Sequence, residues 1–326
     1  MGMRVLVTGG AGFIGSHVSQ ALLERGDDVV CLDSLDDYYA PSLKRRNLVL
    51  VREVAERKRR QYTFVEGDIR DTELLAALGR REGFGAIVHL AARAGVRPSI
   101  EQAPLYADVN VTGTVRLLEL ARAFGVRNFV FASSSSVYGE RTNVPFRESD
   151  PVDHPVSPYA ATKKAGELLC STYQQLFDLD TTCLRFFTVY GPRQRPEMAI
   201  AHFTRLLASG KTVPLFAGGS GRRDFTFIDD IVDGVLRALD RNEGYSIYNL
   251  GNHRMVTTKE LVETIAHALG VEPSVELLAN QPGDVSTTCA SLEHSQKGLG
   301  YEPRIELSEG IAKYVEWYRT EKVGRS

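Results

Sequence analysis

The first half of the chain repeats one pattern: a short apolar run, a turn rich in glycine or polar residues, and then a helical stretch. Six such runs lie at residues 3–8, 28–32, 62–66, 86–90, 128–132 and 181–187. Runs that are apolar at nearly every position are typical of strands buried on both faces. Their alternation with helices predicts an α/β fold with a doubly wound, Rossmann-type parallel sheet.

The pattern changes after about residue 188, where shorter elements alternate with loops such as residues 216–224. We therefore predict a Rossmann domain over 1–188 and a smaller α/β domain over 189–326. A helix at 228–239 leads to a strand at 245–250, which we expect to rejoin the main sheet. Two amphipathic helices are predicted near the end of the chain, at 257–269 and 307–318.

Composition narrows the possible partners. The chain has 326 residues, 43% hydrophobic and 25% charged, as in ordinary soluble globular proteins. A net charge of −2 offers no general attraction to nucleic acid or to an anionic membrane, so neither is an expected partner. No apolar run reaches the length of a membrane span. The cysteines lack metal-ligand spacing, so we expect reduced packing residues, no metal, and a cytoplasmic protein: Cys31, Cys170, Cys183 and Cys289.

A glycine-rich turn joins the first strand to the first helix. Gly9 permits the tight turn, Gly12 allows a pyrophosphate to approach the backbone, and Gly15 lets the helix close on the sheet. Phe13 and Ile14 begin a helix whose N-terminus faces the phosphates. Asp33 ends the second strand, where a carboxylate accepts from the adenosine ribose hydroxyls and disfavours a 2′-phosphate. We therefore predict that the cofactor is NAD rather than NADP.

Further cofactor contacts are expected after the next strands. Asp68 and Ile69 lie in a loop at the end of the third strand, placed to touch an adenine. Ala91 and Ala92 follow the fourth strand, where small residues leave room for ribose and phosphates. Asn110 is a polar residue in a helix and needs partners if it is buried. It either contacts the cofactor or forms a structural bridge between strands, and both roles can coexist.

Tyr159 and Lys163 are the candidate catalytic pair. They lie one helical turn apart, so a helix places the phenol and the ammonium on one face. A fixed cation favours the phenolate and lowers the pKa of a tyrosine, which makes it a general base for an alcohol proton. The same spacing recurs at Tyr318 and Lys322, so only the context of the first pair distinguishes it.

That context resembles a known family. The glycine-rich turn, Asp33, Asp68, Asn110, Ser134, Tyr159 and Lys163 follow one another as in the extended, sugar-nucleotide-modifying branch of the short-chain dehydrogenase/reductases. The resemblance implies that Ser134 bonds the reacting oxygen, Tyr159 shuttles the proton and Lys163 also holds the nicotinamide ribose. It also implies three further contacts with NAD: Ser133, Phe186 and Val189. It also implies a homodimer through helices around 104–124 and 157–177.

Within that branch, the chain looks like the UDP-glucuronate 4-epimerases. Dehydratases carry Asp and Glu after the serine or threonine of the fifth strand, where this chain has Ser135 and Ser136. Without that acid, simple epimerisation at C4 through a 4-keto sugar is favoured over elimination. The segments 185–192 and 195–199 resemble those of UDP-glucuronate 4-epimerases, and the domain over 189–326 is then the substrate-binding one.

The resemblance also implies a substrate site. It places Thr188, Ser136 and Arg195 around the C5 carboxylate, where arginine offers a planar donor fork. Arg223 is expected to meet a diphosphate, and Asp284 to contact the uridine diphosphate. Arg193-Gln194 and Ser291 depart from the pattern of many such epimerases. The alternatives are a UDP-galactose 4-epimerase, a related sugar-nucleotide dehydrogenase or decarboxylase, and a non-catalytic dinucleotide sensor.

Overall fold

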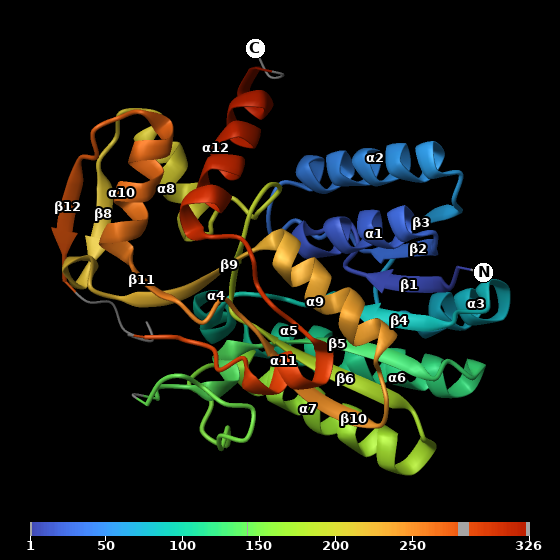
Figure 1. The fold of residues 1–326 in the computed structure, drawn as a ribbon. Helices are drawn as coiled ribbons and strands as arrows, with labels where there is room; N and C mark the ends of the chain where they lie inside the picture. The colour runs from blue at the N-terminus through green and yellow to red at the C-terminus, as the bar shows by residue number, and fades with distance from the viewer. Residues whose placement is uncertain (1, 142, 280–286, 324–326) are drawn as a thin grey trace.

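The protein consists of a larger part built on one broad sheet and a smaller part that lies beyond the carboxyl ends of its strands (Figure 1). The computed structural model describes residues 2–141, 143–279 and 287–323. The seven strands of the main sheet are β1 (Arg4–Thr8), β2 (Asp28–Asp33), β3 (Tyr62–Glu66), β4 (Ala86–His89), β5 (Asn128–Ser134), β6 (Asp180–Phe186) and β10 (Tyr245–Leu250).

All neighbouring strands of this sheet run parallel, in the order β10-β6-β5-β4-β1-β2-β3. The order reverses direction at β1, which makes the sheet doubly wound and confirms the predicted Rossmann-type fold. A crevice forms where such an order reverses, because successive connections there leave to opposite faces of the sheet. A ligand site is therefore expected beyond the carboxyl ends of β1 and β4.

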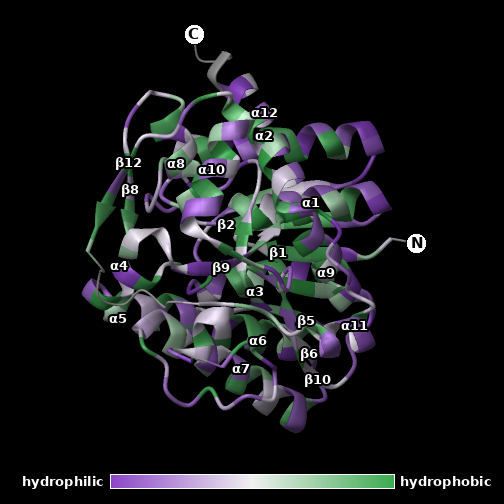
Figure 2. Ribbon diagram, turned by 60° about the vertical axis from the view of Figure 1, so that its left-hand side comes forward, coloured by the Kyte–Doolittle hydropathy of each residue, from purple (hydrophilic) through white to green (hydrophobic). Residues whose placement is uncertain are grey.

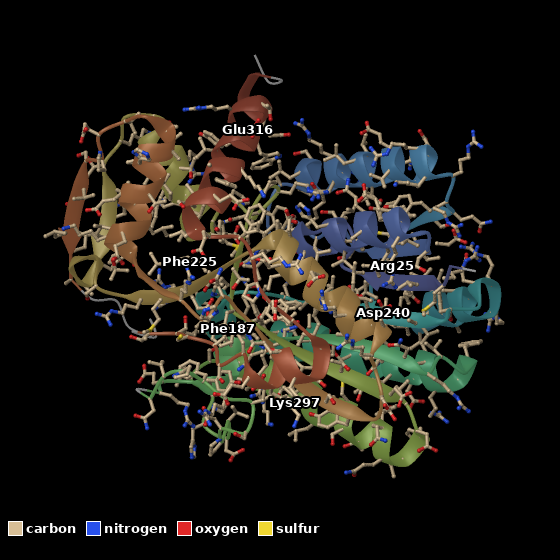
Figure 3. All side chains as sticks on the ribbon, viewed as in Figure 1. Arg25, Phe187, Phe225, Asp240, Lys297 and Glu316 are labelled. Carbon is tan, nitrogen blue, oxygen red and sulfur yellow. The ribbon has the colours of Figure 1, made fainter. Side chains whose placement is uncertain are left out.

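Helices cover both faces of the sheet. One face carries α1 (Phe13–Arg25), α2 (Pro41–Lys58) and α9 (Ile228–Asp240), and the other carries α3 (Thr72–Glu82), α6 (Gly113–Phe124) and α7 (Pro158–Phe177) (Figure 1). The ion pair between Arg25 and Asp240, 2.9 Å apart, joins α1 to α9 (Figure 3).

Alternation along the strands separates two cores. In β1, Val5 and Val7 pack under α1, whereas Leu6 faces the opposite core with Phe129 and Phe131 of β5. Successive strand residues point to opposite faces, so a strand buried on both sides must be apolar throughout. Figure 2 shows this as a hydrophobic sheet between helices whose outer turns are hydrophilic.

The smaller part contains two minor sheets. A three-stranded sheet joins β7 (Thr188–Tyr190), β9 (Arg222–Phe227) and β11 (Met255–Thr257), and a two-stranded sheet joins β8 (Val213–Phe216) to β12 (Val275–Leu278). Against these pack α8 (Ala199–Leu207), α10 (Thr258–Leu269) and α12 (Leu307–Val323). Helix α10 begins with a capping box between Thr257 and Glu260.

The chain returns twice from the smaller part to the main sheet. After β9, helix α9 and strand β10 go back, and β10 pairs with β6 from Tyr245 to Leu250. Later, α11 (Glu293–Leu299) lies against β10. The strand predicted at 181–187 is β6, which ends at Phe186, and the chain then leaves the sheet and begins β7 at Thr188.

Candidate active site

A cavity of about 420 Å³ opens at the carboxyl ends of the main strands. Its walls come from the loops after β1 to β5, from α7 and from the segment that follows β6. Phe187, labelled in Figure 3, lies on its wall where the two parts of the molecule meet. The sequence-predicted residues on this cavity are Gly9, Gly12, Phe13, Ile14, Gly15, Asp33, Asp68, Ile69, Ala91, Ala92, Ser133, Ser134, Ser136, Tyr159, Lys163, Phe186, Thr188, Val189 and Arg195.

The glycine-rich turn is as tight as its sequence predicts. Gly9 has a φ of 69°, and a Cβ there would lie 2.7 Å from the backbone nitrogen of Ala91. Gly12 stands before the first residue of α1 and offers no side chain to cap it. The Gly12 N–H donates to the Gly9 carbonyl at 3.0 Å, so the donors left for an anionic ligand are the uncapped N–H groups of the first turn of α1, which suit a dinucleotide pyrophosphate.

Asp33 is fixed at the end of β2 by backbone donors. Its Oδ2 accepts from the Ala11 N–H at 3.1 Å, and its Oδ1 accepts from the Leu35 N–H at 2.9 Å. Burial raises the pKa of this carboxyl, while these N–H groups and the nearby Lys44 ammonium oppose the shift. Each carboxylate oxygen keeps a free lone pair, so the side chain can still accept from ribose hydroxyls.

The other cofactor candidates differ in their contacts. Asp68 is half-exposed and forms an ion pair with Arg70, which lowers the pKa of the Asp68 carboxyl. Ile69 is buried beside it. The Ala91 N–H donates to the Thr8 hydroxyl at 3.3 Å, which ties the loop after β4 to the end of β1. Ala91 and Ala92 thus line the cavity with small side chains on a tethered backbone.

Asn110 bridges two segments instead of lining the cavity. Its Oδ1 accepts from the Arg93 N–H at 2.8 Å, and its Nδ2 donates to the Arg93 carbonyl and to the Thr162 hydroxyl, each at 3.0 Å. It lies in a π-turn, Asp108–Thr112, which widens the helix at this point. Asn110 is therefore a structural bridge, but it joins the loop after β4 to helix α7 and not two strands, and its direct cofactor contact stays a prediction.

Helix α7 presents the candidate catalytic pair. Ser157 caps the helix, accepting from the Ala160 N–H at 3.1 Å, and Pro158 occupies the first helical position. Tyr159 and Lys163 then fall on successive turns of the same face. The Lys163 ammonium is buried and donates to the Ala132 carbonyl at 2.7 Å. Burial lowers the pKa of Lys163 to about 8.

The lowering of the Tyr159 pKa by Lys163 together with a cationic cofactor stays a prediction, and the groups around the phenol act in both directions. Burial raises the pKa of the Tyr159 phenol above its usual value, although the Ser134 hydroxyl and the Arg195 charge act to lower it. Lys163 aims at the Ala132 carbonyl, with its nitrogen 5.9 Å from the centre of the Tyr159 ring. Burial thus opposes ionisation of the phenol, and a positive charge beside the ring would favour it.

Two of the four serines around the end of β5 are linked to each other. The Ser134 hydroxyl donates to Ser136 Oγ at 3.0 Å and accepts from the Ser136 N–H at 3.2 Å. Ser133 instead donates to Glu167 Oε1 at 2.7 Å, and Glu167 forms a buried two-point ion pair with Arg185. The Ser133 hydroxyl donates its proton to Glu167, so it can only accept a hydrogen bond from a ligand. The sequence did not indicate that Glu167 supports Ser133 in this way.

The predicted substrate contacts are only partly brought together. Thr188 and Arg195 lie on the cavity wall, where Arg195 Nη1 is 3.2 Å from Glu197 Oε1. Arg223 lies on β9, where Val256 of β11 is its pairing partner, and it is not on that wall. Asp284 falls outside the described residues. The diphosphate contacts of Arg223 and Asp284 stay predictions.

The cavity also includes side chains that the sequence did not reveal. The stretch around 38–60 reads as a charged surface helix, yet the residues just before α2 turn into the cavity, and Lys44 of its second turn lies there as well. The spacing of these residues in the sequence did not predict that they reach the cavity, since the helical pattern begins only at Pro41. The unpredicted polar residues are Asp36, Tyr38, Tyr39, Lys44 and Arg93.

Among residues 2–141, 143–279 and 287–323, no three His, Cys, Asp or Glu side chains gather as they would around a metal ion. Within the same part of the chain, none of the helices combines the length and apolar character needed to cross a bilayer.

Comparison with known proteins identifies relatives over nearly the whole chain. The model of the NAD dependent epimerase/dehydratase family matches residues 5–251. UDP-glucuronate 4-epimerase 4 of Arabidopsis thaliana is 44% identical over 97% of this chain and 75% of its own length. Protein CapI of Staphylococcus aureus is 39% identical over 97% of this chain and 98% of its own.

Two solved epimerase structures are similar to this chain in sequence and fold. The UDP-glucuronic acid 4-epimerase of Bacillus cereus, in complex with UDP-glucuronic acid and NAD, is 33% identical with a TM-score of 0.89, over 98% of this chain and 100% of that one. The UDP-glucose 4-epimerase of Thermotoga maritima, with UDP-glucose, is 32% identical with a TM-score of 0.88, over the same shares.

Proposed function

Since the chain belongs to the NAD dependent epimerase/dehydratase family, we propose that it inverts C4 of UDP-glucuronate to give UDP-galacturonate. One observation carries the proposal: Ser134, Tyr159 and Lys163 share a cavity with Thr188 and Arg195. Groups suited to a sugar hydroxyl thus stand beside groups suited to a carboxylate. Relatives named as UDP-glucuronate 4-epimerases support the same assignment.

The residues present fit NAD. A side chain at Gly9 would collide with the loop after β4, no side chain caps the first turn of α1, and Asp33 offers acceptors to ribose hydroxyls. When bound, oxidised NAD takes up and returns the hydride of C4, and its positive ring favours ionisation of a neighbouring phenol. That charge would offset the burial of Tyr159, which raises the pKa of its phenol.

Tyr159 is proposed to take the proton of the C4 hydroxyl and to return it at the end of the cycle. Ser134 is held by Ser136 on one side, so its oxygen has a defined orientation toward the reacting hydroxyl. Lys163 is anchored by the Ala132 carbonyl and keeps two of its three donors for ribose hydroxyls. The sugar must present both faces in turn, so the pocket has to hold it mainly by its diphosphate.

The side chains available for acid–base chemistry favour epimerisation of the sugar over elimination of water. Elimination of water needs an acid beside the departing hydroxyl, and the two positions after Ser134 are Ser135 and Ser136. Both line the cavity as neutral hydroxyls. A 4-keto sugar formed here therefore has no carboxyl group from this segment to drive a further step.

The uronate carboxylate also needs a firm grip. Oxidation at C4 makes a β-keto acid, which tends to lose CO₂ unless the carboxylate is held in a polar pocket with its C–C bond poorly aligned to the ketone. Thr188, Ser136 and Arg195 are the proposed contacts. Ionic hydrogen bonds to arginine are short and strong, which suits that task.

A homodimer is part of the proposal. Helices α6 and α7 carry four large apolar side chains that are exposed in the single chain: Phe124, Leu168, Leu176 and Phe177. A self-complementary pairing of these two helices with a second copy would bury them, as a twofold interface does.

The test is a panel of UDP-sugars incubated with the purified protein, with the epimers resolved by chromatography. We expect interconversion of UDP-glucuronate and UDP-galacturonate without net production of NADH. Exchange of UDP-glucose with UDP-galactose, in the absence of any uronate turnover, would instead assign the alternative UDP-galactose 4-epimerase activity. Accumulation of NADH would point to a dehydrogenase.

A further inference from the structure

Two arginines from different segments lie against one tyrosine ring in the cavity. The guanidinium carbon of Arg93, from the loop after β4, is 5.8 Å from the ring centre of Tyr38. That of Arg195, from the segment after β7, is 5.6 Å from the same centre. Both distances fall within the range of a cation–π contact. We call Tyr38, Arg93 and Arg195 the two-arginine cluster.

Each arginine already has one carboxylate partner. Arg93 Nη1 lies 3.0 Å from Asp36 Oδ1, and Arg195 Nη1 lies 3.2 Å from Glu197 Oε1. Asp36 and Glu197 are 34% and 44% exposed, so both ion pairs are weak. A guanidinium has five donors, and these contacts leave several of them for a ligand.

The backbone of the cluster is held firmly. Asn110 bonds both the N–H and the carbonyl of Arg93, and the Tyr38 N–H donates to Asp36 Oδ1 at 2.9 Å. The loops that carry Arg93 and Tyr38 are thus each braced by hydrogen bonds before a ligand arrives, and the Arg93–Asp36 ion pair joins them. Preorganised donors of this kind lose little entropy when they bind an anion.

The cluster stands beside the candidate catalytic tyrosine. Tyr106 packs edge-on against Tyr159 with ring centres 6.3 Å apart, and its hydroxyl donates to the carbonyl of Ala94, next to Arg93. Arg195 and Tyr38 both influence the pKa of Tyr159, the first lowering and the second raising it. An anionic substituent near the reacting carbon would therefore lie within reach of the cluster.

We propose that Arg93 is a second contact for the substrate carboxylate, and that Tyr38 is the positioning residue that holds Arg93 and Arg195 together for it. The inference rests on the proposed function, because it names how that site selects a uronate over a neutral hexose. Asp36 competes with the substrate for Arg93 and so limits this selectivity.

The test compares dissociation constants of UDP-glucuronate and UDP-glucose for the NAD-loaded protein, measured by calorimetry and expressed as a ratio. Arg93→Gln should lower the preference for UDP-glucuronate roughly tenfold to a hundredfold, since a charged contact is lost. Tyr38→Leu should lower it roughly two- to fivefold, and Tyr38→Phe, which keeps the ring, should leave it close to wild type.

Asp36→Asn should change the preference for UDP-glucuronate in the opposite direction, and misfolding would not explain such a change. The asparagine oxygen can still accept from the Tyr38 N–H, while the countercharge on Arg93 disappears. We expect the preference for UDP-glucuronate to rise roughly two- to fivefold, a gain that damage to the fold does not produce.

Equal losses for both sugars in Arg93→Gln would make Arg93 a diphosphate contact and overturn the proposal. An unchanged ratio in Arg93→Gln and Asp36→Asn would overturn it as well. If wild-type protein binds both sugars equally, the proposed function itself fails before any variant is compared. A wild-type preference for UDP-glucuronate that Arg93→Gln leaves intact rejects the cluster alone.

Discussion

Removal of the Arg185 charge should destabilise the protein far more than removal of an exposed arginine. Arg185 and Glu167 are 1% and 0% exposed, and two hydrogen bonds of 2.8 and 2.9 Å join them behind Ser133. In Arg185→Met, the Glu167 carboxylate would stay buried with only the Ser133 hydroxyl and the Lys164 ammonium, 3.5 Å away, as partners.

The size of the effect follows from that environment. Breaking a buried ion pair by removing one partner costs about 3–5 kcal/mol. Because Lys164 still offsets part of the charge, we expect about 3 kcal/mol, which corresponds to a fall in Tm of roughly 6–12 °C on the scale of domains of 150–250 residues. The double variant Arg185→Met/Glu167→Leu should lie within about 2 kcal/mol of wild type, since no unpaired buried charge remains and the groups that lose a partner are the Ser133 hydroxyl, the Lys164 ammonium and the Glu148 carbonyl.

Urea unfolding followed by circular dichroism measures these differences. The matched control is Arg57→Met, because Arg57 pairs with Glu24 at 3.0 Å but both side chains are more than half exposed. That variant should change the free energy of unfolding by no more than about 1 kcal/mol. If Arg185→Met were no less stable than Arg57→Met, or the double variant no more stable than the single one, the reasoning would be refuted.

Four further outcomes are expected. Tyr159→Phe should retain NAD but lower turnover at least about a hundredfold, and wild-type turnover in it would exclude Tyr159 as the base. Arg195→Ala should weaken UDP-glucuronate binding roughly tenfold to a hundredfold in calorimetry while sparing UDP-glucose; equal losses would mark a general nucleotide contact. Burial lowers the pKa of Lys163 to about 8, so its charge is lost as the pH rises through that value and turnover should fall there; a pH profile that stays flat well into the alkaline range contradicts this. Leu176→Arg should convert the expected dimer to monomer in sedimentation, because Leu176 is 67% exposed on α7, and an unchanged dimer would move the interface elsewhere.

Elements set by local pattern were predictable from the sequence. The main strands are continuous apolar runs, and each ends at a turn residue, so the sheet could be anticipated before its strand order was known. The tight turn at Gly9 and the placement of Tyr159 and Lys163 on one helix face each depend on a single turn of the backbone, so both could be predicted from the sequence. Their place on one cavity follows from the rule that ligands bind at the carboxyl ends of parallel strands.

Features that depend on side chains meeting across loops were not predictable. The contact of Tyr38 with Arg93 and Arg195 joins three loops that no local periodicity relates. The direction of the Lys163 ammonium likewise depends on the position of the Ala132 carbonyl on the neighbouring strand. Sequence spacing gives the face of a helix on which a side chain lies, but not the partner it selects there.

The return of the chain to the main sheet limits how this molecule can be divided. A fragment that ends at residue 188 would lack β10, which leaves β6 as a bare sheet edge and deprives Tyr138 of the Asn249 oxygen that accepts from its hydroxyl at 2.7 Å. The two regions are therefore not exchangeable modules. A chimera that takes its substrate-binding region from a relative must keep residues 228–250 and α11 with the sheet they complete, so the foreign sequence has to enter as separate insertions.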